Sequence, residues 1–352
     1  MNTASLFPIL QSQPVGLVRM AAGSQHADDG HEVEFKTLEV RGILNKSVSK
    51  RKLWMAYSIN PYRGCEFGCR YCYARYTHGF MVGADGENGE LAGPEAFERK
   101  IFIKQNAAWL LEQELRKFDG EQEIALGTAT DPYQPIERRA KVTRSLLEVF
   151  ARKEGLTLGI VTKSTLIERD IDLLTAIAAR NQLVVHITIT TPEIKLARLL
   201  EPRAPRPDLR LDTVQRLRDA GLVAGILCCP LLPGITDSAA AIDRMAARAA
   251  EVRASFFAAQ PLFLKSCSRP TFLSFVREHF PALQTDYAER FAGRDFADGP
   301  YKRMLAARVS AACRKYGLAE RSSDALLTRG VGDVKKPVGS ALIPRQRMLF
   351  AS

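Results

Sequence analysis

The feature that most constrains the fold is a regular alternation of short apolar runs and amphipathic segments between residues 56 and 279. Apolar runs rich in β-branched residues are typical of buried strands. Segments with helical spacing of apolar residues lie between and after them. The expected strands are 56–59, 123–127, 156–162, 183–190, 223–229 and 256–263, and the expected helices are 106–118, 144–153, 169–180, 212–220, 238–252 and 270–279. This order predicts an α/β fold with a parallel sheet covered by helices.

The sheet could be doubly wound or could close into an open barrel, and periodicity does not separate the two. No Gly-x-Gly-x-x-Gly follows a strand and no Gly-x-x-x-x-Gly-Lys-[Ser/Thr] occurs, so the fingerprints of dinucleotide-binding and P-loop folds are missing. Around a core domain over residues 51–265 we predict an irregular N-terminal arm over 1–50. A helical, basic C-terminal extension is predicted over 266–352, ending in a flexible tail.

Composition and targeting signals favour a cytoplasmic protein with no membrane partner. No window approaches the ~18 uncharged apolar residues of a membrane span. The N-terminus lacks the charged and apolar regions of a secretory signal, and Arg19 is its only basic residue before Lys36, unlike a mitochondrial presequence. The seven cysteines are odd in number and three are bunched, which argues against a disulfide framework.

The net charge of +11 is unevenly distributed. Residues 300–352 hold 11 Lys and Arg against 3 Asp and Glu, a balance of 11 − 3 = +8. A basic extension of this kind favours a polyanionic partner such as a nucleic acid. The alternative is a solvated tail that aids solubility.

The loop over residues 58–76 carries the most specific chemistry. Cys65, Cys69 and Cys72 are spaced x3 and x2, and Gly64 and Gly68 give the backbone the freedom to wrap around a metal centre. A structural zinc site needs a fourth ligand, for which His78 is the local candidate. A [4Fe–4S] cluster held by three cysteines leaves one iron free to bind a small molecule.

The motif Cys65-x3-Cys69-x-Tyr71-Cys72 resembles the signature of radical S-adenosylmethionine (SAM) enzymes, and the resemblance extends over about residues 57–263. It implies a partial (βα)6 barrel of the TIM type with the three cysteines on a [4Fe–4S] cluster. It also implies that the free iron binds SAM, and that SAM is reductively cleaved to methionine and a 5′-deoxyadenosyl radical that attacks a substrate. A reductant such as flavodoxin or ferredoxin would supply the electron.

Two further motifs narrow the resemblance to the spore photoproduct lyase-like branch, which includes members of unknown substrate. They are Thr128-Ala129-Thr130-Asp131 and Thr162-Lys163-Ser164. Strand carboxyl ends build the site in parallel α/β barrels. We therefore expect Lys163 to pair with the SAM carboxylate and Tyr71 to pack against the adenine. Two threonine pairs, Thr128 with Thr130 and Thr188 with Thr190, are expected to serve the amino group and ribose of SAM, although threonine at strand ends also simply fits β structure.

One departure from that branch concerns the hydrogen donor. Its DNA-repair members use a further cysteine in the first half-barrel, and no cysteine lies between Cys72 and Cys228 here, which argues against thymine-dimer repair. The catalytic candidates are Tyr73, as a hydrogen donor in place of a thiol, and Asp131. The alternatives are that Tyr73 packs the loop and that Asp131 belongs to a Pro-stiffened turn.

Three hypotheses of function follow. The first is a radical SAM enzyme that acts on a nucleic acid, and the second is one that modifies a protein or a small molecule. The third is a non-catalytic binding protein with a zinc-stapled loop. Cys228, Cys229, Cys267 and Cys313 are expected to be ordinary structural thiols in each of them.

Overall fold

The computed structural model describes residues 32–46, 56–81, 91, 93, 95–118 and 122–328. The chain divides into two units, residues 1–33 and 34–352, and the helices and strands of the fold belong to the second. The predicted arm at residues 1–31 and 47–50, and the predicted tail after residue 328, lie outside the described residues.

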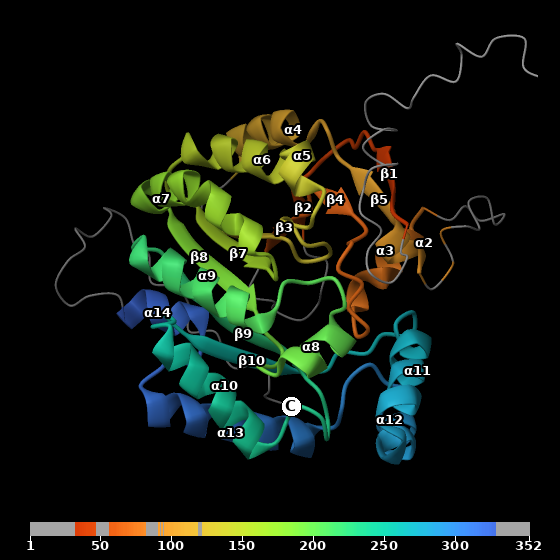
Figure 1. The fold of residues 1–352 in the computed structure, drawn as a ribbon. Helices are drawn as coiled ribbons and strands as arrows, with labels where there is room; N and C mark the ends of the chain where they lie inside the picture. The colour runs from red at the N-terminus through yellow and green to blue at the C-terminus, as the bar shows by residue number, and fades with distance from the viewer. Residues whose placement is uncertain are drawn as a thin grey trace, which may run out of the picture. The chain divides into compact units, whose positions relative to one another are not determined.

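A seven-stranded sheet forms the centre of the fold (Figure 1). Six strands are parallel and pair in chain order, and β2 joins the first of them antiparallel. In sheet order the strands are β2 (Asn45–Lys46), β3 (Tyr57–Ile59), β6 (Glu123–Leu126), β7 (Thr157–Thr162), β8 (Gln182–Thr188), β9 (Val223–Leu231) and β10 (Phe257–Pro261). Because the parallel strands pair in chain order, and β2 and β10 end the sheet without pairing with each other, the fold is the partial (βα)6 barrel that the resemblance implies and not a doubly wound sheet.

Helices connect successive strands and run along one side of the sheet (Figure 1). The connecting helices are α4 (Ala107–Glu114), α5 (Glu137–Ala140), α6 (Val142–Ala151), α7 (Ile171–Arg180), α8 (Ile194–Leu200), α9 (Pro207–Asp219) and α10 (Ala239–Glu251). Their buried faces carry the periodic apolar residues of the sequence, such as Leu146, Leu147 and Phe150 in α6.

Phe256, just before β10, packs between β8 and β9. Its ring centroid lies 5.0 Å from that of His186, and a Cβ added to Gly225 would lie 2.5 Å from the Phe256 ring. Gly225 therefore makes room for a fully buried aromatic side chain. Packing fills this level of the strands, so a site has to form beyond their carboxyl ends.

A small second sheet was not predicted. It joins β1 (Glu34–Thr37), β5 (Lys100–Ile103) and β4 (Tyr62–Arg63) in the order β1-β5-β4. The prediction of an irregular arm is thus wrong over residues 32–46, which contain β1 and β2. These two strands are four and two residues long and mostly exposed, so they carry no apolar run that periodicity could detect.

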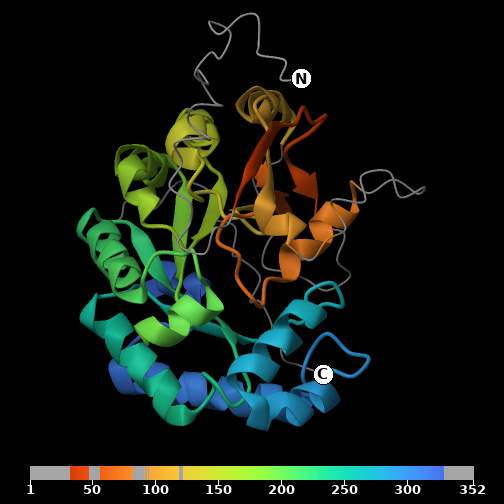
Figure 2. The same cartoon turned by 45° about the vertical axis from the view of Figure 1, so that its right-hand side comes forward.

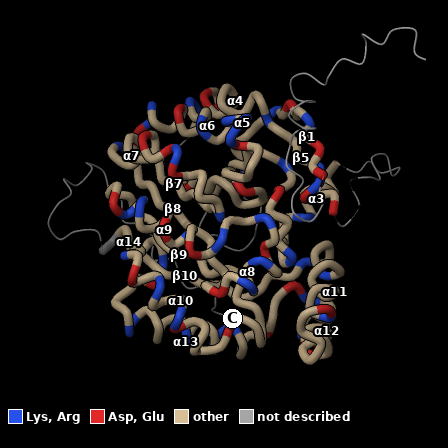
Figure 3. Tube along the Cα trace, in the orientation of Figure 1, with Lys and Arg blue, Asp and Glu red and all other residues tan. Residues whose placement is uncertain are grey.

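The C-terminal extension is helical as predicted, with α11 (Arg269–His279), α12 (Gln284–Arg290), α13 (Gly299–Tyr316) and α14 (Ser322–Thr328). It is also an integral part of the fold, because α13 buries Leu305, Val309 and Cys313. Figure 3 shows the basic residues of α13 and its neighbours interspersed with acidic ones.

Short helices α2 (Tyr76–Gly79) and α3 (Ala96–Arg99) follow the cysteine loop. No helix in the described part of the chain is long and apolar enough to span a membrane.

Candidate functional site: the cysteine loop at the carboxyl ends of the strands

The three motif cysteines lie on the loop that follows β3 and β4. Cys69 is buried, and Cys65 and Cys72 are partly buried. The loop turns at Gly64 (φ +85°) and Gly68 (φ +60°), and a Cβ on Gly64 would lie 2.7 Å from the carbonyl oxygen of Lys100. Backbone freedom is thus required where the sequence predicted it.

The three thiols are close enough to influence one another electrostatically. Burial raises the pKa of Cys65, and the charges of Asp131, Cys69 and Cys72 raise it further. Burial likewise raises the pKa of Cys69 to about 12, with Lys163 acting in the opposite direction. Ionisation of these thiols therefore requires positive charge close to the sulfur atoms.

Residues after β6 clamp the loop from one side. The hydroxyl of Thr130 donates to the carbonyl of Gly64 at 2.5 Å, and the side-chain amide of Gln134 donates to both, at 3.1 and 3.3 Å. The Gln134 side-chain oxygen accepts from the backbone N–H of Glu66 at 2.9 Å. Gln134 is fully buried, so the loop is held by a satisfied polar network.

Lys163 follows β7 and reaches the same loop. Its ammonium group lies 5.7 Å from the ring centroid of Tyr71. Burial opposes its charge, but Cys69, Glu201 and Asp131 raise the pKa of Lys163 above its usual value. Among the residues that the structure describes, no carboxylate forms an ion pair with this ammonium. A partly buried cation of this kind fits an anionic ligand.

A buried ion pair holds Tyr71 in place. Glu201 and Arg210 are each 1% exposed in their side chains and lie 2.5 Å apart. The Tyr71 hydroxyl donates to Glu201, and the hydroxyl of Thr190 donates to the same carboxylate at 3.0 Å. Burial opposes ionisation of Glu201, yet Arg210 and Lys163 lower the pKa of its carboxyl group. The ion pair thus anchors the residue between Cys69 and Cys72 to the barrel.

Other segments close the loop on its remaining sides. Arg203 donates to the carbonyl of Glu66 and lies over Gly68, where a Cβ would come 2.0 Å from the guanidinium. Ser268, just before α11, donates to the carbonyl of Cys72 at 2.6 Å. Figure 2 shows the cysteine loop, in orange, reaching the start of α11, in cyan. Positions far apart in the sequence therefore enclose the three cysteines.

A family model agrees with this arrangement. The model of the radical SAM superfamily matches residues 59–246, which is more than half of the chain. The chain belongs to the radical SAM superfamily.

Its curated relatives have no assigned function. Uncharacterized protein Rv2578c of Mycobacterium tuberculosis (strain H37Rv) is 31% identical over 339 residues, which cover 96% of this chain and 93% of the relative. Uncharacterized protein MJ0683 of Methanocaldococcus jannaschii is 29% identical over 182 residues, 51% of this chain and 62% of the relative.

Solved structures of spore photoproduct lyase variants share the fold. One has a TM-score of 0.57 and 15% identity, and the alignment covers 80% of this chain and 79% of that one. A second variant with the same values was solved with bound AdoMet and a dinucleoside spore photoproduct. At this identity the likeness concerns the fold alone.

A zinc ion and an iron–sulfur cluster make different demands on the ligands of this radical SAM loop. Four ligands at about 2.3 Å from one zinc ion lie roughly 3.8 Å apart. No three Cys, His, Asp or Glu side chains in the described segments are arranged to hold a single metal ion. The Nε2 of His78 is 3.0 Å from the carbonyl oxygen of Lys100 and its ring packs against Phe97 and Phe102, and its role as a fourth zinc ligand stays a prediction. In a cubane each thiolate binds a different iron, so three thiols in one loop fit a cluster.

Asp131 has a positioning role in the structure. One carboxylate oxygen accepts from the Thr162 hydroxyl at 2.6 Å and from the N–H of Tyr133 at 2.9 Å, and the other accepts from the N–H of Lys163 at 2.7 Å. Burial raises the pKa of Asp131, while Thr162 and the backbone donors lower it. The carboxylate thus ties the loop after β6 to the end of β7, and a direct catalytic role stays a prediction.

The threonine pairs have partners within the protein. Thr128 and Thr130 lie beyond β6, which ends at Leu126 before Gly127 turns the chain (φ +92°). Thr188 ends β8 and accepts at its carbonyl from Arg210 at 2.8 Å. The Thr190 hydroxyl lies 2.9 Å from that of Tyr71. Contacts of these pairs with SAM stay predictions.

The role of Tyr73 as a hydrogen donor stays a prediction. The Tyr73 side chain is 37% exposed, and its hydroxyl donates to the carbonyl of Thr128, just beyond the end of β6.

Sequence reasoning missed Gln134, Arg210 and Ser268, the supports of the loop. A buried arginine on the apolar side of the helix 207–219 was the one available signal, and without a known partner it could not be interpreted.

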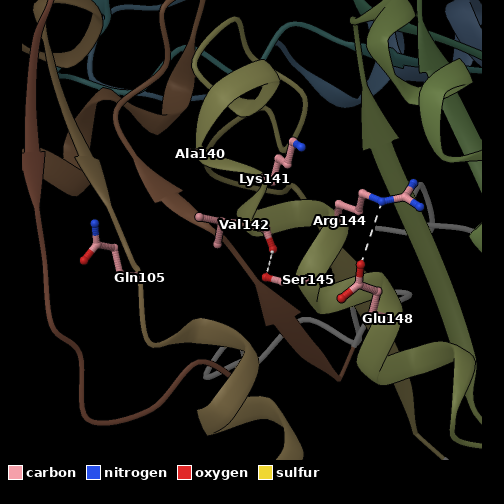
Figure 4. A pocket seen from close by; sticks show the side chains of 7 residues that line it. All are labelled: Gln105, Ala140, Lys141, Val142, Arg144, Ser145 and Glu148. Carbon is pink, nitrogen blue, oxygen red and sulfur yellow. Dashed lines mark hydrogen bonds and ion pairs between the residues drawn. The ribbon is translucent and has the colours of Figure 1, made fainter. Parts of the chain in front are cut away.

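A separate surface hollow of about 420 Å³ lies at the turn before α6 (Figure 4). Its lining includes Gln105, Lys141 and Arg144 and none of the predicted site residues. The amino end of α6 beside it is already capped by Glu137, which accepts from the N–H groups of Thr143 and Arg144. We assign no function to it.

Proposed function

We propose that this protein cleaves SAM reductively and uses the resulting 5′-deoxyadenosyl radical on a substrate at the barrel mouth. The observation that carries the proposal is the convergence of Cys65, Cys69, Cys72 and the cation of Lys163 at the carboxyl ends of parallel strands. The cysteines would hold a [4Fe–4S] cluster, which when bound supplies the electron that splits SAM into methionine and the radical.

The chain's own residues bind and orient. Lys163 would pair with the SAM carboxylate, and the Tyr71 ring beside its ammonium restricts where that charge can lie. Glu201 and Arg210 fix Tyr71, and Thr130 with Gln134 fixes the loop, so the thiols are preorganised.

Apolar packing around the loop would limit the access of water. Phe67, Leu262, Leu264 and Phe272 pack in one buried cluster with Cys69 and Tyr71. Water exclusion protects a reactive radical from side reactions. Tyr73 is proposed as the residue that contacts the substrate-derived radical and gives it a hydrogen atom, after which one electron and one proton restore the phenol from the tyrosyl radical. Because cleavage consumes one electron, we also propose a flavodoxin or a ferredoxin as partner.

Anaerobic reconstitution with iron, sulfide, SAM and dithionite tests the proposal. The protein should gain the brown iron–sulfur absorbance and release 5′-deoxyadenosine. Cys65→Ala should lose both, whereas Cys313→Ala, in α13, should retain both. Full iron content and SAM cleavage in Cys65→Ala would overturn the ligand assignment.

A further inference from the structure

Aromatic and lysine side chains from four separate segments meet beside the barrel mouth. Together they are called the aromatic–lysine strip: Tyr76 and Phe80 from α2 and its end, Phe263 and Lys265 after β10, Phe296, and Lys302 of α13. All six side chains are partly or fully exposed, and Phe80 is 73% exposed. No motif in the sequence joins them.

Rings and ammonium groups alternate along the strip. The rings of Phe263 and Phe296 are stacked, with centroids 4.4 Å apart and planes at 10°. The Lys265 ammonium lies 4.4 Å from the ring centroid of Tyr76 and 5.7 Å from that of Phe263, and the Lys302 ammonium lies 4.6 Å from that of Phe296. Aromatic rings and positive charges thus lie side by side, and a base could stack on them where a lysine side chain moves aside or at the exposed ring of Phe80.

The strip is continuous with the proposed active site. The ring of Tyr73 lies 5.6 Å from that of Phe263, and Tyr73 follows Cys72 directly. Two acidic groups lie nearby: Asp295, 3.6 Å from the guanidinium of Arg269, and Asp298, which caps the amino end of α13. A ligand on the strip would meet the ammonium groups of Lys265 and Lys302 and lead toward Tyr73.

This combination selects one class of ligand. Aromatic faces bind unstacked bases, and adjacent lysines bind the phosphates between them, as in other single-strand binding surfaces. Bases in a duplex are stacked on each other and do not offer their faces to a protein. A polyanion without bases would use the lysines and leave the rings without a role.

We propose that the aromatic–lysine strip binds single-stranded nucleic acid and feeds one of its nucleotides to the barrel mouth as substrate. The binding half of the proposal stands on the strip alone, and the substrate half rests on the proposed function. In the expected arrangement, unstacked bases of the nucleic acid lie along the strip. The phosphates of its backbone lie near Lys265 and Lys302.

Binding is tested with the full-length, cluster-containing protein and labelled 12-nucleotide single strands of DNA and RNA. The comparison probes are a duplex of the same sequence and poly-glutamate, a polyanion without bases. We expect the single strands to bind more tightly than both, with an affinity that falls as salt rises.

Matched variants separate stacking from charge. Phe263→Leu should weaken single-strand binding about tenfold, the scale of one lost stacking contact, and Phe80→Ala is the second variant because its ring is mostly exposed. Lys302→Gln should reduce the salt slope by about 0.7. The controls are Trp109→Leu, an exposed aromatic residue on α4, and Lys315→Gln, also on α13, where the lysine pairs with Asp243. Both should bind as the unaltered protein does.

Equal binding of poly-glutamate and single strands, tighter binding of the duplex, or unchanged binding in both Phe263→Leu and Phe80→Ala would each overturn the strip proposal. SAM cleavage by the unaltered protein is measured in parallel. A protein that cleaves SAM and binds no single strand refutes the strip alone. One that binds single strands and cleaves no SAM refutes the proposed function and the substrate half of this proposal, and leaves the binding half standing.

Discussion

Glu201→Gln should destabilise both the fold and the cysteine loop. The carboxylate is buried and accepts from the guanidinium of Arg210 and from the hydroxyls of Tyr71 and Thr190. Removing its charge leaves the Arg210 guanidinium, whose side chain is 1% exposed, without a counter-ion. Breaking one partner of a buried ion pair costs about 3–5 kcal/mol, and we expect a loss of unfolding free energy in that range.

The other hydrogen bonds of Arg210 favour a loss of unfolding free energy near the lower end of this range. Its guanidinium also donates to the carbonyls of Pro205 at 2.7 Å and Thr188 at 2.8 Å, and these bonds survive the substitution. The glutamine oxygen can still accept one hydrogen bond. The expected loss is therefore about 3 kcal/mol rather than 5.

Urea denaturation of the metal-free protein measures this loss, and iron retained after gel filtration measures the effect on the loop. Asp208→Asn is the matched control. Asp208 pairs with Arg206 at 2.5 Å at the exposed start of α9, the helix that carries Arg210. That exposed pair contributes at most about 1 kcal/mol. A loss below 1 kcal/mol in Glu201→Gln, with full iron retention, would refute the anchoring role of the pair.

Three further predictions concern the cofactor pocket, the hydrogen donor and acid stability. Lys163→Ala should weaken SAM binding by about 1–3 kcal/mol in equilibrium dialysis, and unchanged affinity would remove Lys163 from the pocket. Tyr73→Phe should leave the iron content intact and change the distribution of substrate-derived products, whereas an identical distribution excludes the hydroxyl as hydrogen donor. Burial lowers the pKa of His186 from 6.5 to about 4. The unfolded state then binds more protons, so about 3 kcal/mol of stability should be lost as pH falls from 6.5 to 4. His186→Gln should abolish that part of the acid sensitivity in urea titrations, and an unaltered pH profile would contradict it.

The sequence by itself determined the strands, and its resemblance to the radical SAM family implied the barrel and the predicted metal ligands. Continuous apolar runs are buried wherever the chain places them, so the six parallel strands were predicted within a few residues of their bounds. The cysteines were predictable because three ligands of one centre have to lie close together in the chain when a single loop supplies them. Lys163 was found through its place after a strand, since the carboxyl ends of parallel strands meet at one edge.

Only the tertiary structure decided what surrounds the loop. Thr130 was predicted to face a cofactor, but the turn at Gly127 directs its hydroxyl to Gly64. Arg210, Gln134 and Ser268 act on segments between 9 and 196 residues away. These contacts form only when the chain packs in three dimensions, and the order of residues in the sequence does not indicate them. The same reason hid the aromatic–lysine strip, whose members are scattered between Tyr76 and Lys302 and become neighbours only when α2, the end of β10 and α13 assemble around the barrel mouth.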